Sequence, residues 1–237
     1  MNNLIFKITL SVLCSVSIIF LSCEKKNPVQ PFEKTFTVPT FNRVYAGETF
    51  NVTINKGADF KVQARGEEQY VNHLQVSVEN NILNVSFDNS IAYPSSLDIV
   101  ITMPLLVSVN LAGGSSGSVS GFQGQPTVLR AVLSGHSQAT IVGTAVNTNV
   151  EVGGLSILTI AGSTESLYGQ ISADGRLNAY GLLSTETDLS LTGSSKAYVL
   201  VQNTLFGSVS DESKLYYKGN PTMTHFETYG NGIVIHE

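Results

Sequence analysis

The first half of the chain alternates between apolar and polar residues with a period of two. Three clear examples of the alternation are Phe50-Val52-Ile54, Leu83-Val85-Phe87 and Leu97-Ile99-Ile101. Such a pattern is typical of β-strands that bury one face. Residues 55–59 and 79–81 are rich in Asn, Gly and Asp, so we expect hairpin-like turns there. The only helix that we expect is a short one near Glu67–Leu74.

From about residue 105 the pattern becomes a repeat. Residues 133–141 (LSGHSQATI), 152–160 (VGGLSILTI) and 191–199 (LTGSSKAYV) are nearly the same phrase. Seven anchor positions, 18 to 22 residues apart, hold only Gly, Asp or Asn: Gly113, Gly135, Gly154, Gly175, Gly193, Asp211 and Asn231. These residue types tolerate a positive φ best. We therefore expect a sharp backbone corner at each anchor.

A strand, a corner and a strand repeated about every 20 residues indicate an all-β, parallel β-solenoid. One coil cannot bury its inward face alone, so each coil depends on its neighbours. We expect residues 36–104 to form strands that cover one end, residues 105–237 to form the coils, and the segment after Asn231 to finish the other end. The alternative is a β-sandwich with coincidental glycine turns, which does not explain why the anchors hold only these three residue types.

The N-terminus reads as a targeting segment. Lys7 is followed by an apolar run over residues 8–21, which suits a signal peptide and is too short for a comfortable membrane span. Ser22-Cys23 resembles a bacterial lipobox, which predicts a lipoprotein signal peptide over residues 1–22 and lipid attachment at Cys23. An ordinary cleavable signal is the alternative. Residues 23–35 read as a flexible tether, which leaves one domain over residues 36–237.

Composition and charge narrow the classes of function. The formal net charge is −5 and no Lys/Arg run exceeds Lys25-Lys26, which argues against nucleic acid as a partner. The four histidines lack ligand spacing, and we predict no metal, cofactor or catalytic residue. Arg130 and Arg176 read as isolated cations. Asp174 and Asp211 lie at or beside corners, so a small carbohydrate-active β-helix enzyme (lyase or hydrolase) stays open as an alternative.

Several segments resemble a known family. They are Phe41-Asn42-Arg43-Val44, FNVTINKGADFKVQARGEE and VSVENNILNVSF, followed by Gly/Ser-rich coils. The chain resembles, over most of residues 36–237, the DUF2807 family, named putative auto-transporter adhesin, head GIN domain, which is typical of secreted and lipid-anchored proteins of Bacteroidota. The resemblance implies a right-handed β-helix-like fold in the cell envelope and an adhesive role. It supplies no active-site motif.

One set of outward residues could bind a ligand. Five residues after successive anchors stand Tyr180, Tyr198 and Tyr216, with Lys196 and Lys214 beside them. Aromatic stripes bind sugar rings and protein side chains, although stacked tyrosines also stabilise a sheet without any ligand. We expect a non-catalytic envelope lipoprotein, anchored in the outer membrane through Cys23 and surface exposed, that binds glycan or cell-surface protein. A purely structural envelope component stays open, as does the oligomeric state.

Overall fold

The computed structural model describes residues 31–88, 97–124 and 128–237. The predicted signal peptide and Cys23 lie outside the described residues. The described chain is almost entirely β-structure with one short helix, α1 (Glu68–Asn72), close to where a helix is predicted. Within the described residues, no helix is long and apolar enough to cross a membrane.

The strands up to residue 122 are short. They are β1 (Phe32–Phe36), β2 (Arg43–Ala46), β3 (Phe50–Lys56), β4 (Lys61–Gly66), β5 (Leu74–Glu79), β6 (Ile82–Phe87), β7 (Leu97–Met103), β8 (Ser108–Leu111) and β9 (Ser116–Phe122). Longer strands follow in the repeat: β10 (Val128–Leu133), β11 (Gln138–Val152), β12 (Ile157–Ile171), β13 (Arg176–Leu191), β14 (Lys196–Val209), β15 (Lys214–Lys218), β16 (Met223–Thr228) and β17 (Ile233–His236).

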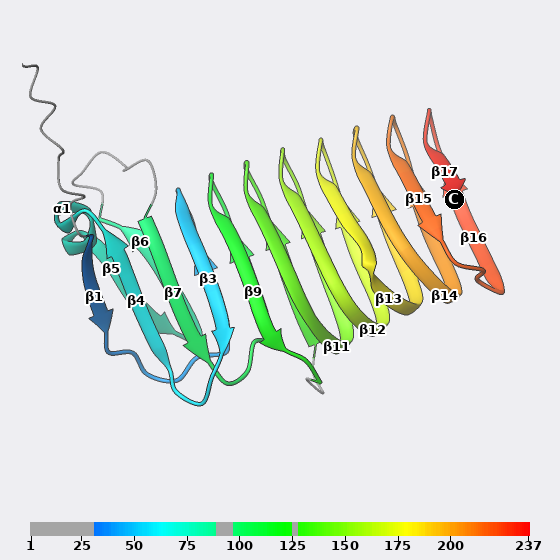
Figure 1. The fold of residues 1–237 in the computed structure, drawn as a ribbon. Coiled ribbons are helices and arrows are strands. Elements are labelled where there is room, and N and C mark those ends of the chain that lie inside the picture. The colour runs from blue at the N-terminus through cyan, green and yellow to red at the C-terminus, as the bar shows by residue number, and fades with distance from the viewer. Residues whose placement is uncertain (1–30, 89–96, 125–127) are drawn as a thin grey trace, which may run out of the picture. The chain divides into compact units, whose positions relative to one another are not determined.

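The strands stack into a parallel β-solenoid of about seven turns, as predicted (Figure 1). We call sheet I the ladder of β5, β6, β2, β8, β10, the C-terminal halves of β11–β14 and β16. Sheet II is the ladder of β1, β4, β7, β3, β9, the N-terminal halves of β11–β14, β15 and β17. Each coil runs along sheet I, turns a corner and returns along sheet II.

The corners form one column of left-handed backbone. Five predicted anchors have positive φ: Gly113, Gly135, Gly154, Gly193 and Asp211. The other two predicted anchors, Gly175 and Asn231, are wrong, because Ala173 (φ 55°) and Gly230 (φ 60°) occupy the corner in those coils. Hydrogen bonds fix this register: Asp174 N–H donates to the Gly154 carbonyl (3.0 Å), and Ser194 N–H donates to the Ala173 carbonyl (2.8 Å).

A buried serine column lies two residues after the corners. Ser115, Ser137, Ser156, Ser195 and Ser213 are all fully buried. The hydroxyls of Ser115, Ser137, Ser195 and Ser213 donate to carbonyls of neighbouring coils, as from Ser137 to Leu111 (3.1 Å) and from Ser195 to Ile171 (3.1 Å). Gly175 belongs to this column, where a Cβ would lie 2.5 Å from the Val152 carbonyl oxygen. Gly175 is thus explained by a close backbone approach and not by a positive φ.

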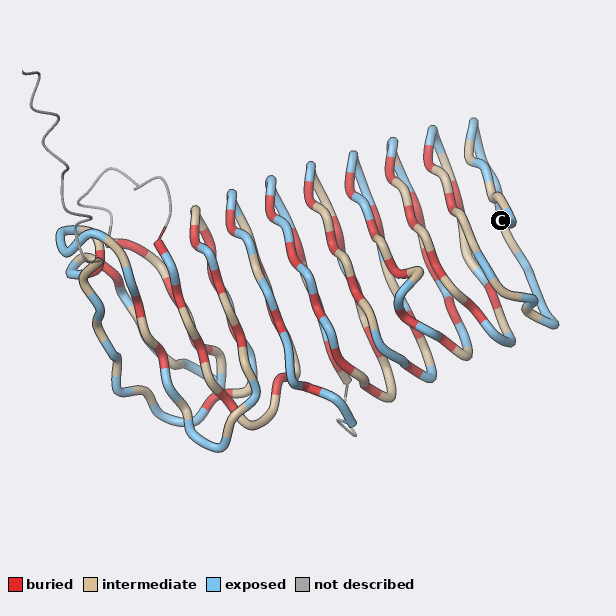
Figure 2. The backbone as a smooth tube through the Cα atoms, viewed as in Figure 1, coloured by how far each residue is buried: buried red, intermediate tan, exposed pale blue. Residues whose placement is uncertain are grey.

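The core lies between the two sheets. Inward residues such as Leu158, Leu177, Ala197 and Leu215 in sheet II are completely buried. Figure 2 shows buried and exposed positions alternating along the coils before the last one, which is the period-two pattern of the sequence. Residues on facing sheets complement one another in size: a Cβ on Gly117 would meet the Leu111 side chain at 2.5 Å.

Residues 36–104 were expected only to cover one end of the coils. They also form a coil of their own. β2 and β3 already form a coil with a corner at Glu48 (φ 66°), and they pair in parallel with β8 and β9. On their other side they pair with β6 and β7, so the first coil in sequence lies between two later segments. Strand β1 also includes residues 32–35, which belong to the stretch predicted as tether.

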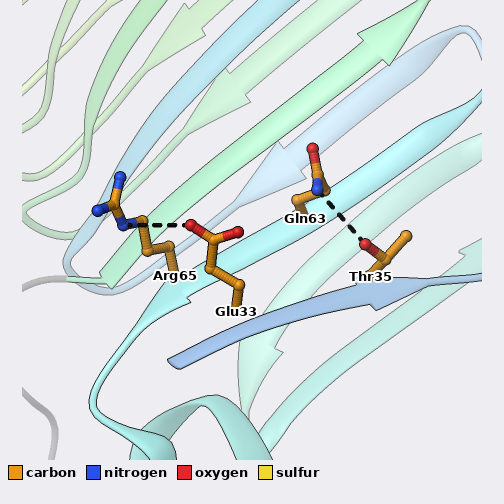
Figure 3. Close-up of polar contacts among 4 residues, drawn as sticks. All are labelled: Glu33, Thr35, Gln63 and Arg65. Carbon is orange, nitrogen blue, oxygen red and sulfur yellow. Dashed lines mark hydrogen bonds and ion pairs between the residues drawn. The ribbon is translucent and has the colours of Figure 1, made fainter. Parts of the chain in front are cut away.

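Antiparallel strands close the N-terminal end, in agreement with the prediction that this region covers it. β4 pairs antiparallel with β7 on one side and with β1 on the other. The turn predicted at residues 55–59 joins β3 to β4, but these two strands do not pair with each other, since β3 pairs with β7 and β9. The hairpin predicted at residues 79–81 is confirmed between β5 and β6. Figure 3 shows the polar contacts on β1 and β4: Arg65 with Glu33 (3.5 Å) and Gln63 with Thr35 (3.4 Å).

Candidate functional site

The outer face of sheet II carries a tyrosine ladder at its C-terminal coils. Tyr198 on β14 and Tyr216 on β15 are register partners, and their rings stack with centroids 4.8 Å apart and an interplanar angle of 8°. Because parallel strands place identical positions one above the other, this stacking follows from the shared distance of each tyrosine to its corner. Both rings are half-buried.

Tyr180 joins the cluster by a different route. Its predicted position in the same column is wrong, because the corner at Ala173 puts Asn178 in register with Tyr198. A β-bulge in β13 breaks the register between Ala179 and Leu183, and Tyr180 lies at its start. The Tyr180 ring still meets Tyr198 edge-on, with centroids 5.6 Å apart. The three predicted tyrosines therefore lie together.

The hydroxyl of Tyr180 is tied down. It donates to Glu237 Oε2 at 2.8 Å, and Lys218 Nζ lies 4.4 Å from the centroid of the Tyr180 ring. Burial, followed by the hydrogen bond to the Glu237 carboxylate, raises the pKa of Tyr180 above its ordinary value. At neutral pH the hydroxyl is therefore protonated and remains a donor.

A row of cations runs beside the ladder. Arg176, Lys196 and Lys214 are successive register partners, three residues after the corners at Ala173, Gly193 and Asp211. The prediction that Arg176 is an isolated cation is wrong, because its position is set by the corner at Ala173 and not by Gly175, and this makes Arg176 the third member of the row. The Arg176 guanidinium also lies 6.0 Å from the Tyr198 ring centroid.

A recess opens where the tyrosine ladder ends. It has a volume of about 320 Å³ and is lined by Thr159, Ile160, Ala161, Arg176, Asn178, Tyr180, Gly181 and Tyr198. Small side chains of β12 form one side and the two tyrosines form the other. Asn178 donates to Thr159 Oγ1 (3.3 Å), which leaves the oxygen of its side-chain amide available as an acceptor. The volume is at the lower end of that usual for small-molecule sites.

The two carboxylates considered for catalysis, Asp174 and Asp211, lie at different corners. Asp211 Oδ2 accepts hydrogen bonds from Gly193 N–H (2.9 Å) and Ser210 Oγ (3.1 Å), so the side chain supports the corner. Asp174 is exposed beside the Ala173 corner, two coils away from Asp211, with its N–H in the backbone ladder. Among the described residues, no group of three or more His, Cys, Asp or Glu is placed to hold a metal ion. Neither carboxylate lines the recess.

The sequence of the chain matches one known family. The family model described as "Putative auto-transporter adhesin, head GIN domain" (DUF2807) matches residues 40–221. The chain belongs to this family. No curated protein matches it.

Solved structures with the same fold include proteins of Bacteroides and Parabacteroides species. A protein of Bacteroides fragilis titled a putative adhesin aligns at TM-score 0.78 and 20% identity, over 88% of this chain and 98% of that one. A putative adhesin from Parabacteroides distasonis aligns at TM-score 0.68 and 16% identity, over 88% and 97%. A protein of the same species described as a putative lipid binding protein aligns at TM-score 0.63 and 13% identity, over 89% of this chain and 98% of that one. At these identities the likeness concerns the fold.

Proposed function

We propose that this head GIN protein is a non-catalytic lipoprotein of the cell envelope that binds a surface ligand through the outer face of sheet II. The observation that carries the proposal is the cluster of Tyr180, Tyr198 and Tyr216 beside a recess, with a cation row along it. Half-buried tyrosines combine apolar ring surface with hydroxyl groups, and this combination is common in binding sites. The family description and the adhesin titles of two structural neighbours support the same role.

The ring geometry decides how a ligand would meet the cluster. Tyr198 and Tyr216 cover each other's faces, so they offer ring edges and hydroxyls over most of the ladder. The recess is the place where Tyr180 and Tyr198 form a wall next to small side chains. A sugar ring or a small side chain seated there would contact the aromatic wall and could hydrogen-bond to Asn178.

Binding is tested with a matched pair of tyrosines. Tyr198→Ala removes the central ring of the cluster, whereas Tyr168→Ala removes an exposed tyrosine from the outer face of sheet I. We expect Tyr198→Ala to weaken binding of the full chain to a glycan array or to host cells at least tenfold, and Tyr168→Ala to leave binding unchanged. Equal binding by both variants, with thermal midpoints within a few degrees of the parent, would leave the tyrosines as a purely structural ladder.

Anchoring is tested separately. Two or more acyl chains on a protein give firm membrane attachment, because each buried CH₂ contributes about 0.8 kcal/mol. We propose that Cys23 carries this lipid and that the chain faces outward from the outer membrane. Cys23→Ser should release the protein from the membrane fraction, and protease added to intact cells should degrade the parent chain. Continued membrane retention of Cys23→Ser would contradict lipidation.

A further inference from the structure

We infer that the ligand of the sheet II face is an acidic polysaccharide. The row of cations holds its acid groups, and the recess beside Arg176 holds one end of the polysaccharide. The inference rests on the proposed function and names the class of ligand. It begins with the row formed by Arg176, Lys196 and Lys214, which lie on three adjacent strands in one register column. Adjacent strands are about 4.8 Å apart, so the three positive charges start from closely spaced backbone positions.

Such an arrangement is unfavourable in the absence of an anion. Like charges directly opposite one another on neighbouring strands destabilise a sheet. Within the described residues, none of the three cations forms an ion pair, although the whole chain carries a net charge of −5. The nearest carboxylates along the chain lie at the corners, where Asp211 Oδ2 accepts hydrogen bonds from Gly193 N–H and Ser210 Oγ. The repulsion is then relieved when an anionic ligand lies along the row.

The strand positions around the row carry no acidic side chain, and the nearest carboxylates along the chain, Asp174, Asp211 and Glu212, lie at the corners two or three residues before Arg176 and Lys214. From β9 to β15 the outward residues of sheet II include no Asp or Glu; they are Ser116, Ser118, Ser120, Gln138, Thr140, Val142, Ile157, Thr159, Ala161, Arg176, Asn178, Tyr180, Lys196, Tyr198, Leu200, Lys214, Tyr216 and Lys218. Glu237, after β17, is engaged by the Tyr180 hydroxyl. An anion approaching this face meets cations, neutral polar groups and tyrosines.

The opposite face is different in charge. On the same coils of sheet I the outward residues include Glu186 and Asp188 on β13 and Glu227 on β16. The cation Arg130 on that sheet is paired with Glu151. On these coils the cation row lies on sheet II and the acidic strand residues lie on sheet I, which would orient the sheet II face toward an anionic surface.

The chemistry of the recess favours a carboxylated sugar. Arg176 is exposed at its edge and presents a planar fork of donors that suits a carboxylate. Tyr180 and Tyr198 supply an aromatic wall for the apolar side of a pyranose ring, and Asn178 supplies an amide for its hydroxyls. An extended peptide is a poorer fit, because its side chains on one face recur about every 6.8 Å, whereas the cations recur about every 4.8 Å. Successive acid sugars would continue from Arg176 toward Lys196 and Lys214.

The test compares two forms of one polymer. Polygalacturonate carries a carboxylate on each residue, and its methyl ester has the same sugar without the charge. We expect the full chain, purified in detergent, to bind polygalacturonate at least tenfold more tightly than the ester, and the difference to shrink at high salt. Lys196→Gln with Lys214→Gln should weaken binding to polygalacturonate at least tenfold and leave binding to the ester unchanged. Lys61→Gln, an exposed cation on β4 of the same sheet, should change neither.

The outcomes separate this inference from the proposed function. Equal binding to acid and ester, lost in Tyr198→Ala, would overturn the inference and keep the binding face. Tyr198-dependent binding to cells with no binding to either polymer would also overturn it, in favour of a protein ligand. Lysine-dependent binding to phosphatidylglycerol vesicles and not to polygalacturonate would overturn it in favour of a lipid surface. A thermal midpoint at low salt that rises in Lys196→Gln would support the repulsion on which the argument depends, and a clear fall would contradict it.

Discussion

Two stretches of the outer face of sheet II rest on the same backbone and carry different side chains. Over β9 and the N-terminal halves of β11 and β12, the outward residues are uncharged and mostly small. Over β13, β14 and β15 they are tyrosines and cations, together with Asn178 and Leu200. Beneath both stretches the inward residues are apolar and buried, and the corners share one hydrogen-bond ladder. The backbone therefore depends on inward and corner positions, and the outward positions are free to acquire a function.

The largest expected effect comes from the corner column that both stretches share. At Gly193 (φ 76°) a Cβ would lie 2.9 Å from the Ala173 carbonyl oxygen. Gly193→Val adds this contact to the strain of a β-branched residue at positive φ, so we expect a loss of about 3 kcal/mol in the free energy of unfolding. Ser194→Val at the exposed neighbouring position should stay within about 0.5 kcal/mol. Equal thermal midpoints for the two variants would contradict the role given to the corner.

The next effect concerns the serine column inside the coils. Ser195 is fully buried, donates to the Ile171 carbonyl and lies 3.2 Å from Ser213 Oγ. Ser195→Ala removes both contacts and should lower the free energy of unfolding by about 1 kcal/mol. Ser194→Ala is the exposed control, and denaturant titration measures both. No loss in Ser195→Ala would mean that the buried hydroxyls do not hold neighbouring coils together.

A third change extends the aromatic stretch by one coil. Asn178 is the register partner of Tyr198, so Asn178→Tyr continues the ladder and should raise the free energy of unfolding by about 0.5 kcal/mol. The same change fills the recess, and we expect ligand binding to fall. The free energy of unfolding would then rise while ligand binding falls. This would separate the structural role of the ladder from the binding role of the recess. Binding that survives Asn178→Tyr would place the ligand away from the recess.

The smallest effect is expected at the boundary between the stretches. Ala173 has a left-handed φ of 55° and is exposed. Ala173→Gly relieves this strain and adds flexibility to the unfolded chain, so we expect a net gain of about 0.5 kcal/mol. Gly175→Ala, two residues away, should instead destabilise, because its Cβ would meet the Val152 carbonyl oxygen. Calorimetry on both variants checks the sign, and a loss in Ala173→Gly would contradict the corner assignment.

The fold could be predicted from the sequence because a solenoid repeats its constraints. The recurring Gly, Asp and Asn indicated the corners, and the alternation of apolar residues gave the buried face. The prediction failed at Gly175, because a glycine can be required by a close approach as well as by a positive φ, and at Asn231, because Gly230 one residue earlier forms the corner. The threading of β2 and β3 between later strands was also missed, since local patterns carry no information on which strands pair over long separations.

The candidate site could be predicted only in part. Tyr198, Tyr216, Lys196 and Lys214 were found because they share one distance from their corners. Arg176 was missed because the corner of its coil was predicted at Gly175, two residues after the true corner at Ala173. The bulge that turns Tyr180 toward Tyr198 and the recess beside it depend on a local change of register, which no periodicity in the sequence reveals.

The position of the first coil bears on how the chain is assembled during synthesis. β2 and β3 receive one pair of neighbours from residues 82–103 and the other pair only from residues 108–122. A polypeptide that emerges from the ribosome or translocon with its N-terminus first therefore keeps one edge of this coil unpaired until residue 122 has passed. Further coils can then add to that template one after another, each needing only the coil before it.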